Sequence, residues 1–348
     1  MLKLPSFSFG RKRAESFGLD LGSSAVKVVQ LREAGGSYAL AAYAVVQLPP
    51  ETIVDGTIKE PLIVTEAIKE AVAKAGIKTR DAIIGICGRE LIIKKIEIPD
   101  VPANELAGAV QLEAEHHIPF AADEVSLDYH VIGRRGNVMD LILVAVKKAK
   151  VAEYVGVVEE AGLVPVVVDV DGFAVENQYE LNEPERGDEA VALIDIGASI
   201  MKTNVTRGGA SIFARDIPFG GNRYTEAIAS AMSLSFEQAE AAKLAQSGDA
   251  NAVDSISREL SLEVQRTFDY FASTAESERI GKIVLSGGCA VMPGLTDYLS
   301  QMWGIPVETA KPFERIDAGP FADEVAAAGP SLAVAVGLAL RRSGDKAP

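Results

Sequence analysis

The hydrophobic pattern at the start of the chain alternates between runs of strand length and one helical segment. Apolar runs separated by Gly-Ser and Gly-Gly turns predict three strands, at 17–21, 26–31 and 38–48. From Pro61 to Ala75 the apolar residues recur at helical spacing and Gly76 follows directly, so we expect a helix that ends there. A further short apolar run predicts a buried strand at 82–86.

A separate pattern occupies residues 88–164. Apolar runs predict strands at 91–98, 125–132 and 138–146, and amphipathic spacing predicts helices at 104–118 and 151–161. The order is strand, helix, strand, strand, helix. This set predicts a compact small domain inserted into the chain.

The second half of the chain repeats the alternation of strands and helices. A strand at 164–170 and a helix at 172–181 precede a polar segment at 182–189, whose Pro184 and Gly187 predict a linker. The later elements are a second apolar strand at 191–197, a strongly helical region at 223–279, a strand at 282–285, and helices at 294–302 and 332–340. Strands that alternate with helices in this way predict an α/β fold.

Composition narrows the class of partner. The 348 residues exceed one ordinary domain, and 48% hydrophobic with 24% charged residues is a normal globular balance. The net charge is −15, from 34 Lys and Arg against 49 Asp and Glu. A chain this acidic is a poor general binder of DNA or of anionic lipid. We therefore expect no nucleic-acid partner.

The ends of the chain and its cysteines predict a cytoplasmic protein. A basic cluster, Arg11 to Arg13, lies beside Phe7 and Phe9, and we interpret it as a solvated tail rather than a membrane or partner contact. No run reaches the roughly 20 apolar residues of a membrane span, so we expect no direct membrane insertion. Cys87 and Cys289 have no Cys or His at zinc-ligand spacing, which favours two reduced, buried thiols.

Two segments of the chain match position by position. Residues 20–27 are Asp-Leu-Gly-Ser-Ser-Ala-Val-Lys, and residues 195–202 are Asp-Ile-Gly-Ala-Ser-Ile-Met-Lys. Each segment follows an apolar strand and begins another. Each is therefore predicted to form the tip of a β-hairpin, one in each half of the chain.

The residue types of these tips suit a polyphosphate. Glycine lets the backbone approach a ligand closely, turn N–H groups bind anions, and serine adds a hydroxyl donor. Asp20 and Asp195 would repel phosphate, but they suit a hydrated Mg²⁺, which keeps most of its waters. One such tip is more often an ordinary tight turn. The matched pair favours phosphate binding between two facing tips.

A third motif supports a nucleotide. Residues 283–290, Ile-Val-Leu-Ser-Gly-Gly-Cys-Ala, predict an apolar strand that ends in a Gly-Gly turn. Paired glycines allow a nucleoside to lie against the backbone. The motif alone is weak evidence, and its position after the second tip strengthens it.

The three motifs resemble the phosphate-1, phosphate-2 and adenosine motifs of the actin/Hsp70/sugar-kinase superfamily. Residues 98–129 resemble the small inserted domain of one branch, the PilM family of type IV pilus assembly proteins, which are related to the division protein FtsA. This second resemblance depends on Glu105-Leu106, Glu113-Ala114-Glu115, Ile118-Pro119-Phe120 and Leu127-Asp128-Tyr129. Together the resemblances extend from Phe17 to Arg342.

The resemblance implies an actin-like (ribonuclease H-like), two-lobed ATP-binding fold with an FtsA-type inserted subdomain, 1C. It divides the chain into a flexible tail at 1–16, a first lobe (1A) at 17–87, 165–187 and 326–342, the inserted partner-binding subdomain (1C) at 88–164, a second lobe (2A) at 188–222 and 280–325, and a helical subdomain (2B) at 223–279.

The resemblance also implies the site residues for ATP and Mg²⁺. Those expected at the phosphates are the backbone of Gly22, Ser23, Ser24, Gly197, Ala198 and Ser199; those at the adenosine are Gly287, Gly288 and Cys289; and those at Mg²⁺, through water, are Asp20 and Asp195. Glu240 and Lys243 match the pair that faces ribose and adenine, and they equally fit a surface ion pair.

Three further residues have alternative interpretations. Lys27 and Lys202 would approach phosphate or remain solvated, as strand lysines usually do. Asp171 would orient an attacking water molecule, or it would cap the helix that starts beyond it.

The function implied is that of an ATP-binding scaffold for type IV pilus assembly, with slow ATP hydrolysis at best. The implied partners are the cytoplasmic N-terminal peptide of PilN, an inner-membrane protein, together with other platform and motor proteins of the pilus and possible self-association. The protein would then be peripheral to the inner membrane. A filament-forming FtsA-like protein and a small-molecule kinase are the alternatives. FtsA attaches to the membrane by a C-terminal amphipathic helix, a pattern that residues 340–348 do not show.

Overall fold

The computed structural model describes residues 15–342 with the exception of 184–186, 188 and 275–277. The predicted tail, with its basic cluster, therefore lies almost entirely outside the described residues. Half of the segment that we interpret as a linker, residues 184–186 and 188, also lies outside the described residues. All structural statements below concern the described part of the chain.

A six-stranded mixed sheet forms the centre of what we call the first lobe. Its strand order is β10-β6-β1-β2-β3-β16. The strands are β1 (Phe17–Leu21), β2 (Ala25–Ala34), β3 (Ser37–Gln47), β6 (Asp81–Ile86), β10 (Val164–Val170) and β16 (Ile316–Asp317). The first three strands form an antiparallel meander, and β6 and β10 then add in parallel beside β1.

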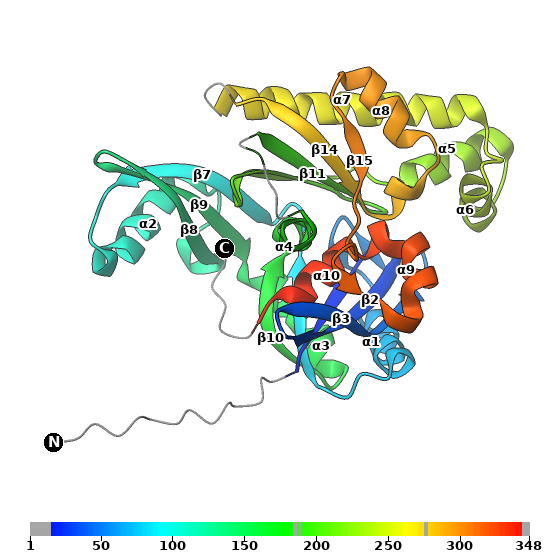
Figure 1. Cartoon of the computed structure of the whole chain (residues 1–348), viewed down its shortest axis with the longest axis horizontal. Helices are drawn as coiled ribbons and strands as arrows, with labels where there is room; N and C mark the ends of the chain where they lie inside the picture. Colours follow the sequence, from blue (N-terminus) through cyan, green and yellow to red (C-terminus); the bar gives the residue numbers. More distant parts are fainter. Residues whose placement is uncertain (1–14, 184–186, 188, 275–277, 343–348) are drawn as a thin grey trace.

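The second sheet, which forms the centre of the second lobe, repeats this construction. Its order is β13-β12-β11-β14-β15, with an antiparallel meander followed by parallel additions beside β11. The strands are β11 (Ala190–Ile196), β12 (Met201–Arg207), β13 (Ala210–Ile217), β14 (Ile280–Ser286) and β15 (Val307–Thr309). Figure 1 shows the second lobe above the first.

The two matching segments lie at equivalent places in the two sheets. Asp20 pairs with Lys27 across the β1–β2 hairpin, and Asp195 pairs with Lys202 across the β11–β12 hairpin. Each tip is closed by a backbone hydrogen bond, at 3.1 Å from Gly22 N and at 3.0 Å from Gly197 N. The prediction of two equivalent hairpin tips is confirmed.

Two helices pack together between the sheets, where the lobes meet. They are α4 (Asp171–Asn182) and α10 (Ala333–Leu340). Helix α4 contacts β6 and β10 of the first sheet and also β11 and β12 of the second. A Cβ atom on Gly337 of α10 would lie 1.7 Å from the carbonyl oxygen of Ala174, so the two backbones touch directly.

Helices α1 (Pro61–Ala75) and α3 (Lys148–Glu160) cover the other face of the first sheet. Helix α1 has the bounds predicted from its apolar spacing, and Gly76 ends it in the left-handed conformation. The buried side chains of α3, Tyr154, Val157 and Val158, join the core of the first lobe.

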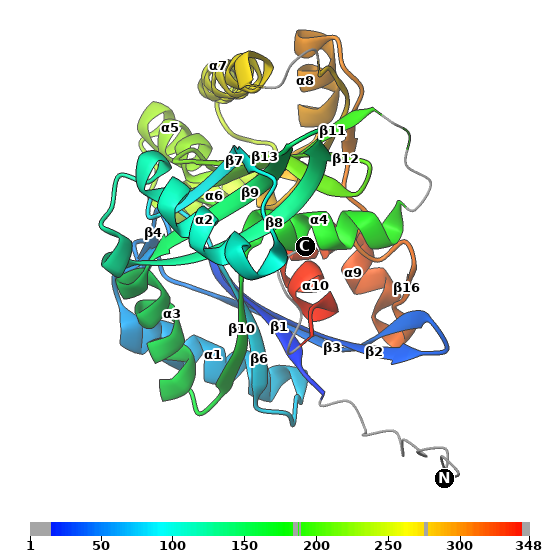
Figure 2. The same cartoon turned by 90° about the vertical axis from the view of Figure 1, so that its left-hand side faces the viewer.

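Residues 88–147, which we call the inserted subdomain, contain a three-stranded antiparallel sheet in the order β7-β9-β8. The small domain predicted at 88–164 is therefore shorter than expected, because α3 packs in the core of the first lobe. Its elements are β7 (Leu91–Pro99), α2 (Ala103–His117), β8 (Val125–Arg135) and β9 (Val138–Lys147). Leu106, Val110 and Ala114 of α2 fill the space between the helix and this sheet. We call β7, β8 and β9 the inserted sheet; Figure 2 shows it on the side of the molecule that faces the viewer.

The helical region of the second lobe covers the outer side of its sheet, with α7 along the top in Figure 1. The helices are α5 (Asn222–Met232), α6 (Phe236–Leu244), α7 (Ala250–Thr274) and α8 (Leu295–Trp303). A capping box at Ser235 and Gln238 begins α6. The two core clusters of the lobes remain separate, which agrees with a two-lobed architecture.

Within the described residues, the continuous helical stretch Gly319–Leu340 is long and apolar enough to cross a membrane by length and composition. It contains α9 (Ala322–Ala328) and α10. Helix α10 packs against α4, β1 and β2, and Ala333 to Leu338 are all buried. This position in the core accounts for the apolar composition of α10.

Several short strands were not predicted. They are β4 (Ile53–Val54), β5 (Thr57–Ile58), β15 and β16. Each is two or three residues long, and so few residues cannot display a periodicity. The β4–β5 hairpin matters for the site because Gly56 at its turn lies close to the second tip.

Candidate functional site

A cleft of about 480 Å³ lies between the two lobes. It is lined by both hairpin tips, by α6, and by the Gly-Gly turn that follows β14. All the site residues predicted from the sequence line this one cleft: Asp20, Gly22, Ser23, Ser24, Lys27, Asp171, Asp195, Gly197, Ala198, Ser199, Glu240, Lys243, Gly287, Gly288 and Cys289. The fold therefore brings together residues from five separate segments of the sequence.

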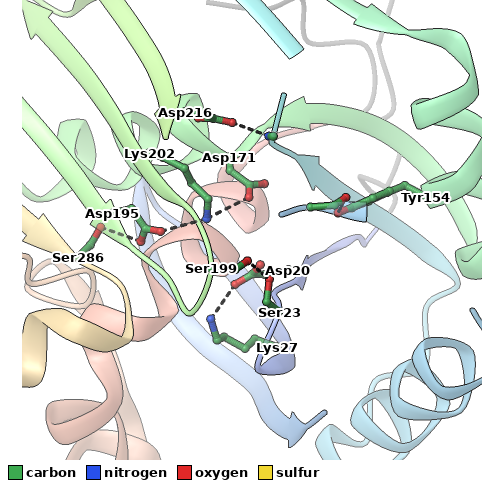
Figure 3. Close-up of polar contacts among 12 residues, drawn as sticks. Asp20, Ser23, Lys27, Tyr154, Asp171, Asp195, Ser199, Lys202, Asp216 and Ser286 are labelled. Carbon is green, nitrogen blue, oxygen red and sulfur yellow. Dashed lines mark hydrogen bonds and ion pairs between the residues drawn. The ribbon is translucent and has the colours of Figure 1, made fainter. Parts of the chain in front are cut away.

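The two tips face each other across the cleft. The Ser23 and Ser199 hydroxyl oxygens lie 2.6 Å apart and share a hydrogen bond, although the residues are 176 positions apart in sequence (Figure 3). Both tips are tight turns that favour glycine, because a Cβ on Gly22 or Gly197 would lie about 3 Å from a carbonyl oxygen of its own hairpin. Backbone N–H groups and hydroxyls from both lobes thus converge on one place.

A carboxylate and an ammonium group pair behind the first tip. Lys27 Nζ donates to Asp20 Oδ2 at 3.0 Å, and both side chains are largely buried. Lys27 is therefore not the freely solvated strand lysine of the alternative interpretation. It lies beside the tip, with its charge balanced by Asp20.

The equivalent lysine of the second tip has two carboxylate partners. Lys202 Nζ lies 3.0 Å from Asp195 Oδ1 and 3.1 Å from Asp171 Oδ2 (Figure 3). The other oxygen of Asp195 accepts a hydrogen bond from Ser286 at 3.0 Å. Burial disfavours the charge of Lys202, but Asp195 and Asp171 outweigh it and raise the pKa of Lys202 well above its usual range.

Asp171 enters the site from the start of the helix between the lobes. It is the first residue of α4, the N-cap is Val170, and no side chain caps the helix, so the capping interpretation is wrong. Gly85 makes room for it, because a Cβ there would lie 2.0 Å from Asp171 Oδ1. Burial raises the pKa of Asp171, Lys202 opposes the shift, and Asp20 adds to it.

Asp169, the neighbouring acid on β10, has a different role. Its Oδ2 lies 3.1 Å from Arg341 Nε, beyond the end of α10, and both side chains are buried. Asp169 does not line the cleft. This ion pair fastens the C-terminal end of α10 to β10.

The Gly-Gly turn presents bare backbone to the cleft. Gly287 has a φ of +86°, and a Cβ on it would lie 2.4 Å from the carbonyl oxygen of Ile196, so only glycine fits there. A Cβ on Gly288 would meet nothing within 4 Å, which leaves open space above this residue. Cys289 is a buried free thiol, and burial raises its pKa to about 11.

Glu240 and Lys243 belong to a polar cluster at the same end of the cleft. Lys243 Nζ lies 2.6 Å from Glu240 Oε2, 2.9 Å from Thr225 Oγ1 and 3.3 Å from the carbonyl oxygen of Gly221. The Lys243 side chain is only 8% exposed. The pair is therefore part of the cleft wall as well as an i, i+3 ion pair.

Sequence reasoning missed the contacts of four residues that complete the site. Lys202 and Ser286 fix Asp195, Thr225 fixes Glu240 and Lys243, and Gly221 approaches so closely that a Cβ would lie 2.7 Å from Cys289 Sγ. The sequence contained one usable signal, because Lys202 is identical to Lys27 in the matched segments. Ser286 belongs to the motif at 283–290, in which only Gly287, Gly288 and Cys289 were assigned a role, and Thr225 and Gly221 show no local pattern.

Comparison with known proteins agrees with this architecture. A chain in a solved PilM–PilN type IV pilus biogenesis complex is 30% identical, with a TM-score of 0.86 over 94% of this chain and 98% of that one. The ethanolamine utilization protein EutJ from Carboxydothermus hydrogenoformans is 17% identical, with a TM-score of 0.55 over 93% of this chain and 88% of that one. MreB5 of Spiroplasma citri bound to ADP is 12% identical, with a TM-score of 0.54 over 94% of this chain and 95% of that one.

These likenesses identify the fold as that of the actin-like ATPases, as the sequence motifs predicted. At 17% and 12% identity, EutJ and MreB5 show the fold alone. The family is shown by a model described as type IV pilus assembly protein PilM, which matches residues 18–343. The chain belongs to the PilM family of type IV pilus assembly proteins.

Proposed function

We propose that the cleft binds ATP, with the polyphosphate between the two tips and the nucleoside over the Gly-Gly turn. The observation that supports this most strongly is the convergence of both tips, at the Ser23–Ser199 contact, in a cleft of about 480 Å³. MreB5, which shares the fold, has been solved with ADP and with AMPPNP. Glu240 and Lys243 would face the ribose and the adenine.

The carboxylates of Asp20 and Asp195 beside the tips suit a hydrated Mg²⁺. Within the described residues, Asp20 Oδ1 has no protein hydrogen-bond donor, whereas both oxygens of Asp195 are engaged by Lys202 and Ser286. Mg²⁺ needs few carboxylates and binds readily through its own waters. We propose that Asp20 is the principal carboxylate and that Asp195 acts at longer range. The ion would neutralise phosphate charge and orient the polyphosphate.

We propose that hydrolysis is slow at best. Asp171 is a cleft carboxylate that lies on neither tip, and a general base must be free to accept a proton. Asp171 Oδ2 lies 3.1 Å from Lys202 Nζ. This ion pair favours the charged form of Asp171 but restricts the movement of its side chain. Asp171 would orient water rather than abstract its proton quickly. This suits a protein whose nucleotide state changes seldom.

We propose that the partner is the N-terminal cytoplasmic tail of PilN, because the similar chain was solved in a PilM–PilN complex. The protein would then be cytoplasmic and peripheral to the inner membrane, near other platform and motor proteins and near further copies of itself. Closure of the lobes on ATP would alter the partner surface.

The inserted subdomain with the first lobe is the proposed surface for this tail. Strand β8 lies at one edge of the inserted sheet, and a sheet edge can accept an added strand. Glu115, Asp123 and Glu124 are exposed and would attract a basic flank on the partner. Leu106, Val110 and Ala114 of α2 are buried in the core of the subdomain, so they do not form part of this surface.

Calorimetry with the whole chain tests both halves of the proposal. ATP with Mg²⁺ should bind, Asp20→Asn and Asp195→Ala should weaken binding, and Asp254→Ala, a change to a half-exposed helix residue, should not. A synthetic PilN tail should bind with an affinity that depends on ATP, and a scrambled tail should not bind. Unchanged ATP affinity in both cleft variants would overturn the nucleotide site, and identical peptide affinity with and without ATP would overturn the coupling.

A further inference from the structure

The inserted sheet is held by the second lobe as well as joined to the first. Strand β13 packs along β7 and also contacts β8 (Figure 2). One apolar cluster combines Ile142 of the inserted sheet, Phe173 of α4 and Ala214 of β13, all of them buried. A subdomain inserted between parts of the first lobe thus rests partly on the other lobe.

Gly88 is the point at which the chain enters this subdomain, and it is contacted from both lobes. Its buried N–H donates to Asp216 Oδ2 of β13 at 2.7 Å, the bond drawn from Asp216 in Figure 3. On its other side, a Cβ would lie 2.8 Å from the carbonyl oxygen of Asp55 in the β4–β5 hairpin. With a φ of +106°, the position admits only glycine without strain.

Strand β12, which pairs with β13, also forms one side of the β11–β12 hairpin that carries the second tip. Ile200 ends that tip, and its Cδ1 atom lies 3.3 Å from the position a Cβ on Gly56 would take and 3.7 Å from the corresponding position on Gly88. Lys202 follows on β12 and pairs with Asp216 across the β12–β13 ladder. A hydrogen-bonded ladder is stiff, so the tip, Asp216 and Ala214 move together.

We propose that Asp216 is a positioning residue. Its hydrogen bond with Gly88, which we call the tie, connects the inserted subdomain to the second phosphate-binding tip. When the second lobe shifts, β13 then carries Gly88 and the start of β7 with it. The ATP-dependent part of this proposal rests on the proposed function, whereas the tie itself does not. The tie would transmit the state of the cleft to the proposed partner surface through one hydrogen bond and one apolar contact.

Amide hydrogen exchange of the whole, ligand-free protein tests the tie. Asp216→Ala removes the acceptor, so the amides of residues 88–99 should exchange at least about tenfold faster than in the wild type. Asp216→Asn keeps a carbonyl oxygen that accepts from Gly88 N–H and should exchange like the wild type. The matched control is Asp254→Ala, the same change on helix α7. Equal exchange in Asp216→Ala and Asp254→Ala would overturn the tie.

The second arm adds saturating ATP and Mg²⁺. In the wild type, ATP should slow exchange at residues 88–99; in Asp216→Ala it should not, while the dissociation constant for ATP stays within about threefold because Asp216 does not line the cleft. A wild-type chain that fails to bind ATP overturns the proposed function and leaves the ligand-free arm to decide the tie. A wild-type chain that binds ATP with no change at residues 88–99 overturns the transmission alone.

Discussion

The hydroxyl oxygens of Ser23 and Ser199 lie 2.6 Å apart, which joins the two lobes at the mouth of the cleft. A polyphosphate between the tips would have to replace this hydrogen bond. The bond is short enough that a pair of cysteines at these positions should be able to form a disulfide. Its formation would fix the tips in contact.

We therefore expect the double variant S23C/S199C to bind ATP when reduced, within about tenfold of the wild-type affinity, and to lose binding when oxidised. Calorimetry before and after adding a reductant measures the change. The single variants are the controls, since Cys87 and Cys289 are buried. ATP binding of unchanged strength in the oxidised double variant would show that the polyphosphate does not lie between the tips.

The two lysines should differ in their contribution to stability. Lys202 lies between Asp171 and Asp195, so Lys202→Met leaves two buried carboxylates without their cation and should cost about 3–5 kcal/mol of unfolding free energy. Lys27→Met leaves only Asp20 and should cost less. The loss in Lys202→Met should be smaller at about pH 5 than at about pH 8, because burial raises the pKa of Asp171 and the variant lacks the lysine charge that opposes this shift. Urea unfolding at both pH values checks this, and equal losses in the two variants would contradict it.

Gly288 allows a substitution that fills the cleft without straining the fold. A Cβ there meets nothing within 4 Å, and the residue lines the cleft. We expect Gly288→Val to keep the thermal stability of the wild type and to weaken ATP binding by at least about tenfold. Gly108→Val, at another glycine with open space and on exposed helix α2, is the matched control. If Gly288→Val bound ATP as tightly as the control variant does, the nucleoside would not lie over this turn.

Asp216 should make the stability of the protein depend on pH. Burial raises its pKa from 3.8 to about 7, Gly88 N–H and Lys202 oppose the shift, and Asp171 and Asp195 add to it. Because the folded state holds the proton more tightly than the unfolded state, the contribution of Asp216 to stability is fully present below about pH 4 and is lost as the pH rises through about 7.

Asp216→Asn stays uncharged at every pH and keeps the acceptor for Gly88. The unfolding free energy of this variant minus that of the wild type should thus be lowest near pH 4, rise between about pH 4 and 7, and then level off. The difference between two proteins cancels the other titrating groups. A difference that stays flat from pH 4 to pH 8 would mean that Asp216 is charged throughout.

The parts predicted from the sequence were those whose signal is local. Asp20 and Asp195 each belong to a tip of consecutive residues, and the matching segments made the two tips visible without any knowledge of their positions in space. The helix that ends at Gly76 was predicted for the same reason.

The parts that were missed arise from tertiary contact. Lys202 meets Asp171 only because α4 passes between the sheets, and Gly85 matters only because Asp171 occupies the space where a side chain would be. Asp216 was not singled out, because nothing near it in sequence indicates Gly88 as its partner. Contacts of this kind leave no pattern of spacing in a single sequence.

The two lobes repeat one construction, but the two sides of the cleft between them are not identical. By the match between residues 20–27 and 195–202, Ser23 corresponds to Ala198, and Ser199 corresponds to Ser24. The mirror of the Ser23–Ser199 hydrogen bond would therefore join Ala198 to Ser24, and Ala198 has no hydroxyl to form it. The approximate twofold relation between the halves is broken at the point where they touch. A ligand with unlike ends thus meets unlike groups on the two sides, and only one of its two orientations satisfies both.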